Sequence, residues 1–149
     1  MELVGFGGGA ITHVSGIDAC GARLAEAGEG MNAGLTLSPS AAGTVERGQV
    51  LATPGSIGAY AEFTATIALL PEEHGGSEVS TGTSLAFYLR GAALSGTVAL
   101  THDHSLHPCH QGAVTVTLER PVALECGQRF AFRYRGRAAG SGTVARLLR

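Results

Sequence analysis

The chain contains no lysine, and its ten basic residues are all arginines. A phosphate-binding loop of the form G-x-x-x-x-G-K-[ST] is therefore excluded, because that loop needs a lysine to reach the phosphates. Without such a loop the chain has no machinery for nucleoside triphosphate hydrolysis. We expect a protein that is not an enzyme.

Long apolar runs, disulfide frameworks and targeting signals are also missing. No segment reaches the ~18 consecutive apolar residues of a membrane-spanning helix. Glu2 stands where a secretory signal would carry basic residues. Cys20, Cys109 and Cys126 are too few and too unevenly spaced for a disulfide framework. We expect a cytoplasmic protein without membrane contact.

Aromatic residues and net charge are scarce as well. The 149 residues include no tryptophan and 5% aromatic side chains, but 23 glycines. This composition favours short strands and turns over long helices, in a chain long enough for one ordinary domain or two small ones. The formal net charge of -2 gives the chain no global attraction for nucleic acid.

Alternating apolar residues predict a barrel in the second part of the chain. At residues 61–69 every odd position is apolar and most even positions are small or polar, which indicates a half-buried strand. Five further segments repeat this pattern, at residues 85–90, 94–100, 113–118, 129–135 and 142–147. We predict an all-β fold in which these six strands form a small antiparallel Greek-key barrel.

The first part of the chain contains shorter candidate strands. Strands are predicted at residues 2–4, 11–16, 35–37 and 49–52, with a glycine-rich turn at 5–10 and a loop at 38–43. Residues 22–27 are compatible with one helical turn or with a loop. Pro54 and Gly55 then turn the chain into the second part, so we place a boundary near Pro54.

The segment that crosses this boundary, ERGQVLATPGSI at residues 46–57, carries a family resemblance. It is similar to the junction between the second and third domains of elongation factor Tu. Residues 1–6, 16–17 and 30–35 resemble the later part of the second domain, and residues 63–70, 87–90, 95–98 and 129–148 resemble the third. The resemblance implies an incomplete second-domain β-barrel at residues 1–53, a third-domain barrel at residues 54–149, and neither a GTPase domain nor GTP binding.

The resemblance also implies binding positions. In elongation factor Tu the second domain helps to hold the aminoacyl end of charged tRNA, and the third contacts the T stem and the nucleotide-exchange factor. Asn32 and Arg47 match second-domain positions around that pocket. Third-domain positions on or near the tRNA-facing side are matched by Arg90, Ser95, Arg137 and Gly140. The chain departs from the family at residues 77–84, which contain no basic residue.

Arg133, Arg135 and Arg137 form the one basic patch of note in the sequence. In a strand, this alternation would place all three side chains on one face. Nucleic-acid binding falls steeply as phosphate contacts are lost, so tRNA binding that rests on these three residues would be weak. We therefore interpret the chain as a non-catalytic binding module for a protein partner, with weak aminoacyl-tRNA binding in translation elongation as the alternative.

A histidine-rich loop at residues 102–110 suggests another alternative, a zinc-binding protein. Imidazole and thiolate groups could fill the four positions of a tetrahedral zinc. The spacing matches no zinc module, however, and a solvated loop between two strands explains the same residues. No other cofactor is expected. The candidate ligands are His102, His104, His107, Cys109 and His110, with Asp103 as a sixth.

An incomplete barrel would leave strand edges without partners. The strands at residues 3–4, 35–37 and 49–52 would lack the neighbours that opening strands supply. Bare edges expose backbone N–H and C=O groups together with apolar side chains. A second copy of the chain can cover both through a two-fold axis, and we predict a homodimer built through residues 1–53.

Overall fold

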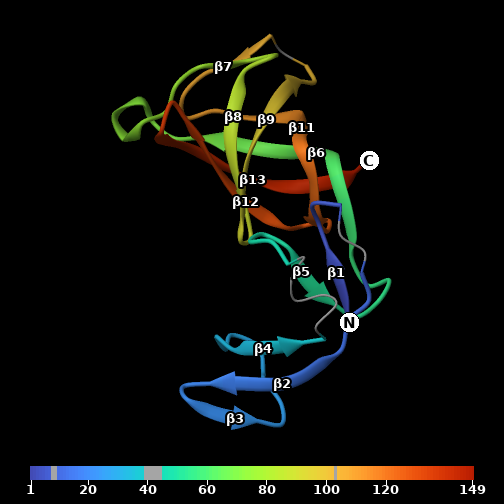
Figure 1. Ribbon diagram of the computed structural model, residues 1–149. Coiled ribbons are helices and arrows are strands. Elements are labelled where there is room, and N and C mark those ends of the chain that lie inside the picture. Colours follow the sequence, from blue (N-terminus) through green and yellow to red (C-terminus); the bar gives the residue numbers. More distant parts are fainter. Residues whose placement is uncertain (8–9, 39–44, 103) are drawn as a thin grey trace.

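The computed structural model describes residues 1–7, 10–38, 45–102 and 104–149, and its main body is a closed barrel of antiparallel strands (Figure 1). The strand order is β11-β6-β13-β12-β8-β9, and the barrel closes because the last strand, β9, pairs with the first, β11. Successive strands β11 and β12 are not neighbours, as expected for a Greek key. The predicted six-stranded barrel is confirmed. Its strands are β6 (Gly58–Leu69), β8 (Ser84–Leu89), β9 (Ala92–Leu100), β11 (Gln111–Leu124), β12 (Arg129–Tyr134) and β13 (Arg137–Leu147).

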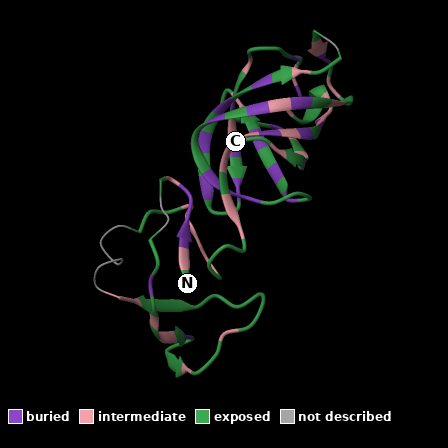
Figure 2. Ribbon diagram, turned by 90° about the vertical axis from the view of Figure 1, so that its right-hand side faces the viewer, coloured by how far each residue is buried: buried purple, intermediate pink, exposed green. Residues whose placement is uncertain are grey.

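Strand β6 shows why the alternating pattern produces this barrel. Phe63, Ala65, Ile67 and Leu69 are all buried, while the residues between them are at least partly exposed. Successive side chains of a strand point to opposite faces, so one face of β6 lines the core and the other meets solvent. Figure 2 shows the same banding of buried and exposed residues on the other barrel strands.

Aromatic rings fill the inside of the barrel. Phe63 and Phe130 meet edge to face with ring centroids 5.7 Å apart, and Phe87 contacts both Phe130 and Phe132, at 5.9 and 6.1 Å. Edge-to-face and tilted pairs at these distances are favourable beyond the area that they bury. Since side chains occupy the interior, any ligand of this barrel has to bind on its outer surface.

A glycine lets β13 pass between its two neighbours. Gly140 pairs with Leu69 of β6 on one side and with Phe132 of β12 on the other. A Cβ atom added there would overlap the carbonyl oxygen of Ala68 and lie 2.7 Å from Cζ of Phe132. Gly140 therefore serves the packing of the barrel wall.

The first part of the chain forms two small antiparallel sheets (Figure 1). Strand β1 (Glu2–Val4) pairs with β5 (Val50–Ala52), and β2 (Val14–Ala19) lies between β3 (Ala22–Leu24) and β4 (Gly34–Leu37). The predicted strands at residues 3–4, 35–37 and 49–52 thus find partners within this part, and β1 also forms a bridge from Glu2 to Ile11. No strand of residues 1–7, 10–38 or 45–52 joins the barrel sheet.

Two predictions for this part need correction. The strand expected at residues 11–16 begins at Val14 and runs to Ala19. The helical turn or loop considered at residues 22–27 contains β3, which forms a hairpin with β2. Cys20 and Gly21 connect them with φ of 52° and 77°, the left-handed pair that a two-residue hairpin turn requires. Of the predicted turn at 5–10, residues 5–7 form a bend and turn with positive φ angles and residues 8–9 lie outside the described residues. All of the predicted loop at 38–43 except Ser38 lies outside them.

Short elements close one end of the barrel. A 3₁₀ turn, η1 (Glu72–His74), follows β6, and two-residue strands β7 (Val79–Ser80) and β10 (Ser105–Leu106) pair with each other. Val79 and Leu106 are buried and complete the core at this end. Within the described ranges, no helix has the length and apolar character needed to cross a membrane.

Replacing Gly140 by alanine should destabilise the barrel. The added methyl group has no space between Ala68 and Phe132, and overpacking of this kind costs about 1–3 kcal/mol. Thermal or urea unfolding of G140A against wild type measures the loss. The exposed neighbour Ser141→Ala is the matched control and should unfold as wild type does; equal stability of G140A and wild type would contradict the packing role.

Candidate functional site

An exposed tyrosine stands on the outer face of the sheet formed by β9, β8 and β12. Tyr88 is 40% exposed and pairs with Ala93 of β9 on one side and with Ala131 of β12 on the other. The guanidinium of Arg133 lies 5.3 Å from the centroid of its ring, within the range of a cation–π contact. The amphipathic ring of Tyr88 and the stacked Arg133 thus project from a surface of small residues.

We call this surface the Tyr88 face. Directly opposite pairs in a sheet share a face, so the register places Ala86, Ser95 and Arg133 together, next to the row of Ala93, Tyr88 and Ala131. The sequence contains a signal for it. In the predicted strand at residues 85–90 the odd positions are apolar, which turns Tyr88 outward. The Tyr88 face consists of Ala86, Tyr88, Ala93, Ser95, Ala131 and Arg133.

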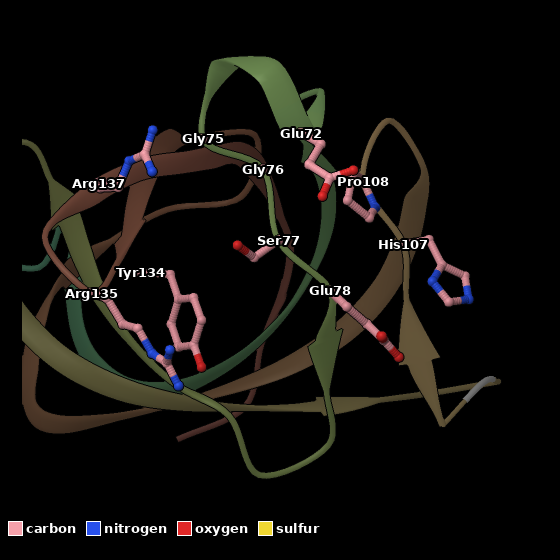
Figure 3. Close-up of a pocket in the computed structure, with 10 residues that line it drawn as sticks. All are labelled: Glu72, Gly75, Gly76, Ser77, Glu78, His107, Pro108, Tyr134, Arg135 and Arg137. Atoms are coloured by element: carbon pink, nitrogen blue, oxygen red, sulfur yellow. The ribbon is translucent and has the colours of Figure 1, made fainter.

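A groove of about 540 Å³ lies beside the hairpin of β12 and β13 (Figure 3). Arg135 and Arg137 line it on one side, and Glu72, Glu78 and His107 line it on the other. Its walls therefore carry both signs of charge. Such a groove does not offer the uniformly positive surface that a phosphate backbone favours.

The prediction that Arg133, Arg135 and Arg137 share one strand face was wrong. Strand β12 ends at Tyr134, and Arg135 and Gly136 form a two-residue turn with φ of 51° and 77°. Arg137 pairs with Tyr134 and lies on its face, whereas Arg133 lies on the opposite, exposed face. The hairpin separates Arg133 from Arg135 and Arg137, which both line the groove, and the spacing in the sequence could not reveal this.

The other predicted binding residues are scattered over the molecule. Asn32 lies in the exposed segment before β4, and Arg47 in the exposed turn before β5. The guanidinium of Arg90 forms a salt bridge with Glu125 at the surface. Ser95 lies on the Tyr88 face, where its backbone N–H donates to Oε1 of Glu119 at 3.2 Å. The structure brings Ser95 and Arg133 together and places the rest elsewhere.

The histidine-rich loop does not gather a ligand set. Within the described part of the chain, no three His, Cys, Asp or Glu side chains lie close enough to hold a metal ion. His107 and His110 come nearest, with ring centroids 6.2 Å apart, and Cys109 lies between them in a left-handed turn conformation. His102 and His104 are exposed at the start of the loop, and Asp103 lies outside the described residues.

An ion pair joins the two parts of the chain at a distance from these surfaces. Nη1 and Nη2 of Arg120 each donate to one carboxylate oxygen of Glu46 at 2.9 Å. These hydrogen bonds hold the pKa of the Glu46 carboxyl below its ordinary value of 4.5. A lowered pKa means that the pair is present at neutral pH and is lost as the pH falls through the lowered value. No pattern in the sequence points to Arg120, whereas Glu46 opens the segment at residues 46–57 that carries the family resemblance.

One comparison with known proteins bears on this arrangement. A family model described as "Elongation factor Tu C-terminal domain" matches residues 56–148, which is more than half of the chain. The matched segment contains all six barrel strands, the Tyr88 face and the charged groove.

Zinc binding by residues 102–110 stays a prediction, and it requires ligands to meet that the described structure keeps apart. It predicts about one zinc per chain after dialysis of tag-free protein, measured by metal analysis. Replacing His104 and His107 by alanine should abolish it, because two lost ligands destroy a four-coordinate site. His13→Ala with His74→Ala, outside the loop, is the matched control. If wild type contained no zinc, or if H104A/H107A retained it, these residues would form a solvated loop and not a zinc site.

Proposed function

Since the chain belongs to the elongation factor Tu C-terminal domain family, we propose that it is a non-catalytic, translation-factor-like binding module whose partner is a protein. The observation that carries this proposal is the Tyr88 face. The filled interior of the barrel directs binding to the outside. The three cysteines are free and exposed, which suits a reducing cytoplasm.

The composition of the Tyr88 face favours a protein partner. Tyrosine and arginine are enriched at the energetic centres of protein interfaces, because they supply a large contact area together with a polar end. Ala93 and Ala131 flank the ring on both sides, so a partner can approach closely around it. Because Arg133 stacks on Tyr88, its guanidinium adds a polar, charged group next to the ring.

The distribution of charge argues against tRNA as the main partner. Arg90 is paired with Glu125, and Arg135 and Arg137 face Glu72 and Glu78 across the groove. Phosphate binding gains from each unopposed cation and weakens strongly with salt. Weak aminoacyl-tRNA binding is the second candidate, supported by the same family membership and resting on Arg133, Arg135 and Arg137.

Replacing Tyr88 by alanine should weaken partner binding about 30-fold or more. This follows from a loss of roughly 2 kcal/mol or more when a central interface tyrosine is truncated, at about 1.4 kcal/mol for each tenfold. Untagged wild type, Y88A and the control Thr143→Ala, which changes an exposed residue of β13, would be used to capture protein and RNA from the native cytosol. The affinity of the captured protein is then measured with each variant.

The same capture separates protein from RNA. A protein bound by wild type and T143A but lost with Y88A supports the proposal. Charged tRNA bound at low salt, unaffected by Y88A and lost after Arg133, Arg135 and Arg137 are all replaced by alanine, would establish the tRNA alternative instead. Equal capture of the protein by wild type and Y88A would remove the Tyr88 face as its binding surface.

A homodimer through residues 1–53 has separate support. Five of the seven large apolar side chains that are exposed in the described residues lie in this part of the chain, Leu35 at 44% among them. Ile17 pairs with Leu24 on one side and Leu35 on the other, so these three share one face of the small sheet. Neither edge of this sheet, β3 or β4, is paired within the described ranges. A second copy could cover face and edge together.

Replacing Leu35 by aspartate should dissociate this dimer, because a carboxylate would be buried in an apolar contact. Sedimentation velocity at micromolar concentrations distinguishes dimer from monomer. Thr36→Asp is the matched control, since it places the same charge on the same strand but on the opposite face. Wild type that sediments as a monomer, or a dimer that L35D leaves intact, would show that this face has no second copy on it.

A further inference from the structure

A bulge in β11 brings an arginine out of the barrel wall. Thr117 pairs with Glu62 of β6, but the next pair along is Val122 with Tyr60. Four residues of β11, 118–121, thus lie opposite a single residue of β6. Pro121 has no N–H to donate to a ladder, which suits it to this irregular stretch. Arg120 projects from the bulge toward the first part of the chain, where its contacts lie.

The guanidinium of Arg120 contacts two separate segments of residues 1–53. Its Cζ lies 4.1 Å from the ring centroid of Phe6, and its two terminal nitrogens bind the carboxylate of Glu46. The planar fork of arginine allows both contacts at once, because the face of the group stacks while its edge donates. One side chain of the barrel thereby holds the chain before β2 and the chain before β5.

The backbone around Arg120 is fitted to the same contact. The N–H of Phe6 donates to the carbonyl of Pro121 at 2.7 Å, and the Phe6 ring packs against the barrel core. Phe6 has φ of 52°, a conformation that bulky residues adopt only where their surroundings hold them. Gly48 lies so close to Ala92 that a Cβ would be 2.9 Å from its Cα.

One further hydrogen bond ties the two segments to each other, and a second orders the segment from Glu46 to Gln49. Nε2 of Gln49 donates to the carbonyl of Gly5 at 2.9 Å, and Oε1 of Gln49 accepts from the N–H of Glu46 at 2.7 Å. The segment from Glu46 to Gln49 therefore contributes Glu46, Gly48 and Gln49 to this contact. Since no described strand pairs across the two parts, the orientation of one on the other depends on such side-chain and loop contacts.

We propose that Arg120 is the joint that fixes the N-terminal sheets on the barrel, so that the two parts behave as one rigid body while Arg120 bridges Phe6 and Glu46. Arg120 and Glu46 have side-chain exposures of 45% and 52%, and an exposed ion pair alone contributes little. The effect comes from combining it with the stacked Phe6 ring at one guanidinium. Removing the Arg120 side chain leaves both parts folded, with the Phe6–Pro121 hydrogen bond and the Gly48–Ala92 contact to orient them, so their relative orientation varies more. This inference does not depend on the proposed function.

The chain's own cysteines allow a direct test. Cys20, in the β2–β3 turn, and Cys126, after β11, are both exposed and lie in different parts. With Cys109→Ser as background, spin labels on these two thiols report the distribution of distances between the parts by pulsed electron resonance. Wild type should give one narrow distribution, and Arg120→Ala should give a distribution at least twice as broad.

Two further variants serve as comparisons for R120A. Glu46→Gln keeps the shape of the side chain and removes its charge, so it should broaden the distribution less than R120A does. Arg146→Ala removes another exposed arginine of the barrel and should leave the distribution narrow. Narrow distributions in both R120A and E46Q would overturn the proposal. So would equal broadening in R146A, or loss of the barrel's cooperative thermal transition in both R120A and E46Q, since Arg120 would then act on folding and not on orientation.

Discussion

Closure of the barrel through β6 is the constraint on which the rest of the structure depends. This strand pairs with β11 along one edge and with β13 along the other. It can do so only because its buried face carries Phe63, Ala65, Ile67 and Leu69 in strict alternation. A closed sheet has no bare edge, so the outer surface is left to side chains alone. The Tyr88 face and the charged groove are consequences of that closure.

The small residues of the wall have distinct roles. Gly140 has no side chain because Phe132 and the backbone of β6 occupy the space. Ala93 and Ala131 are small on the outside, where they leave Tyr88 and Arg133 standing above the sheet. Inside the barrel small residues permit packing, and outside it they expose a contact surface.

The segment at residues 46–57, which resembles the elongation factor Tu junction, gains a physical explanation from the contacts of Arg120 and its neighbours. Glu46 binds Arg120, Gly48 fits against Ala92, and Gln49 binds the backbone of Gly5. Arg47, which the resemblance assigns to a tRNA pocket, is exposed next to Glu46 in this run. A motif at the predicted boundary can thus be explained by the fit between the two parts of the chain as well as by ligand binding.

The sequence by itself determined the all-β class and the six barrel strands, because period-two alternation is a local property that survives without knowledge of partners. Tertiary structure decided everything that depends on register and turns. The hairpin at Arg135 and Gly136 separates Arg133 from Arg135 and Arg137, although the three alternate in the sequence. The contact among Phe6, Glu46 and Arg120 joins residues up to 114 positions apart. It depends on a bulge in β11 that the alternation of the sequence does not predict. Long-range contacts depend on how strands align, and alignment is set by the closed barrel as a whole.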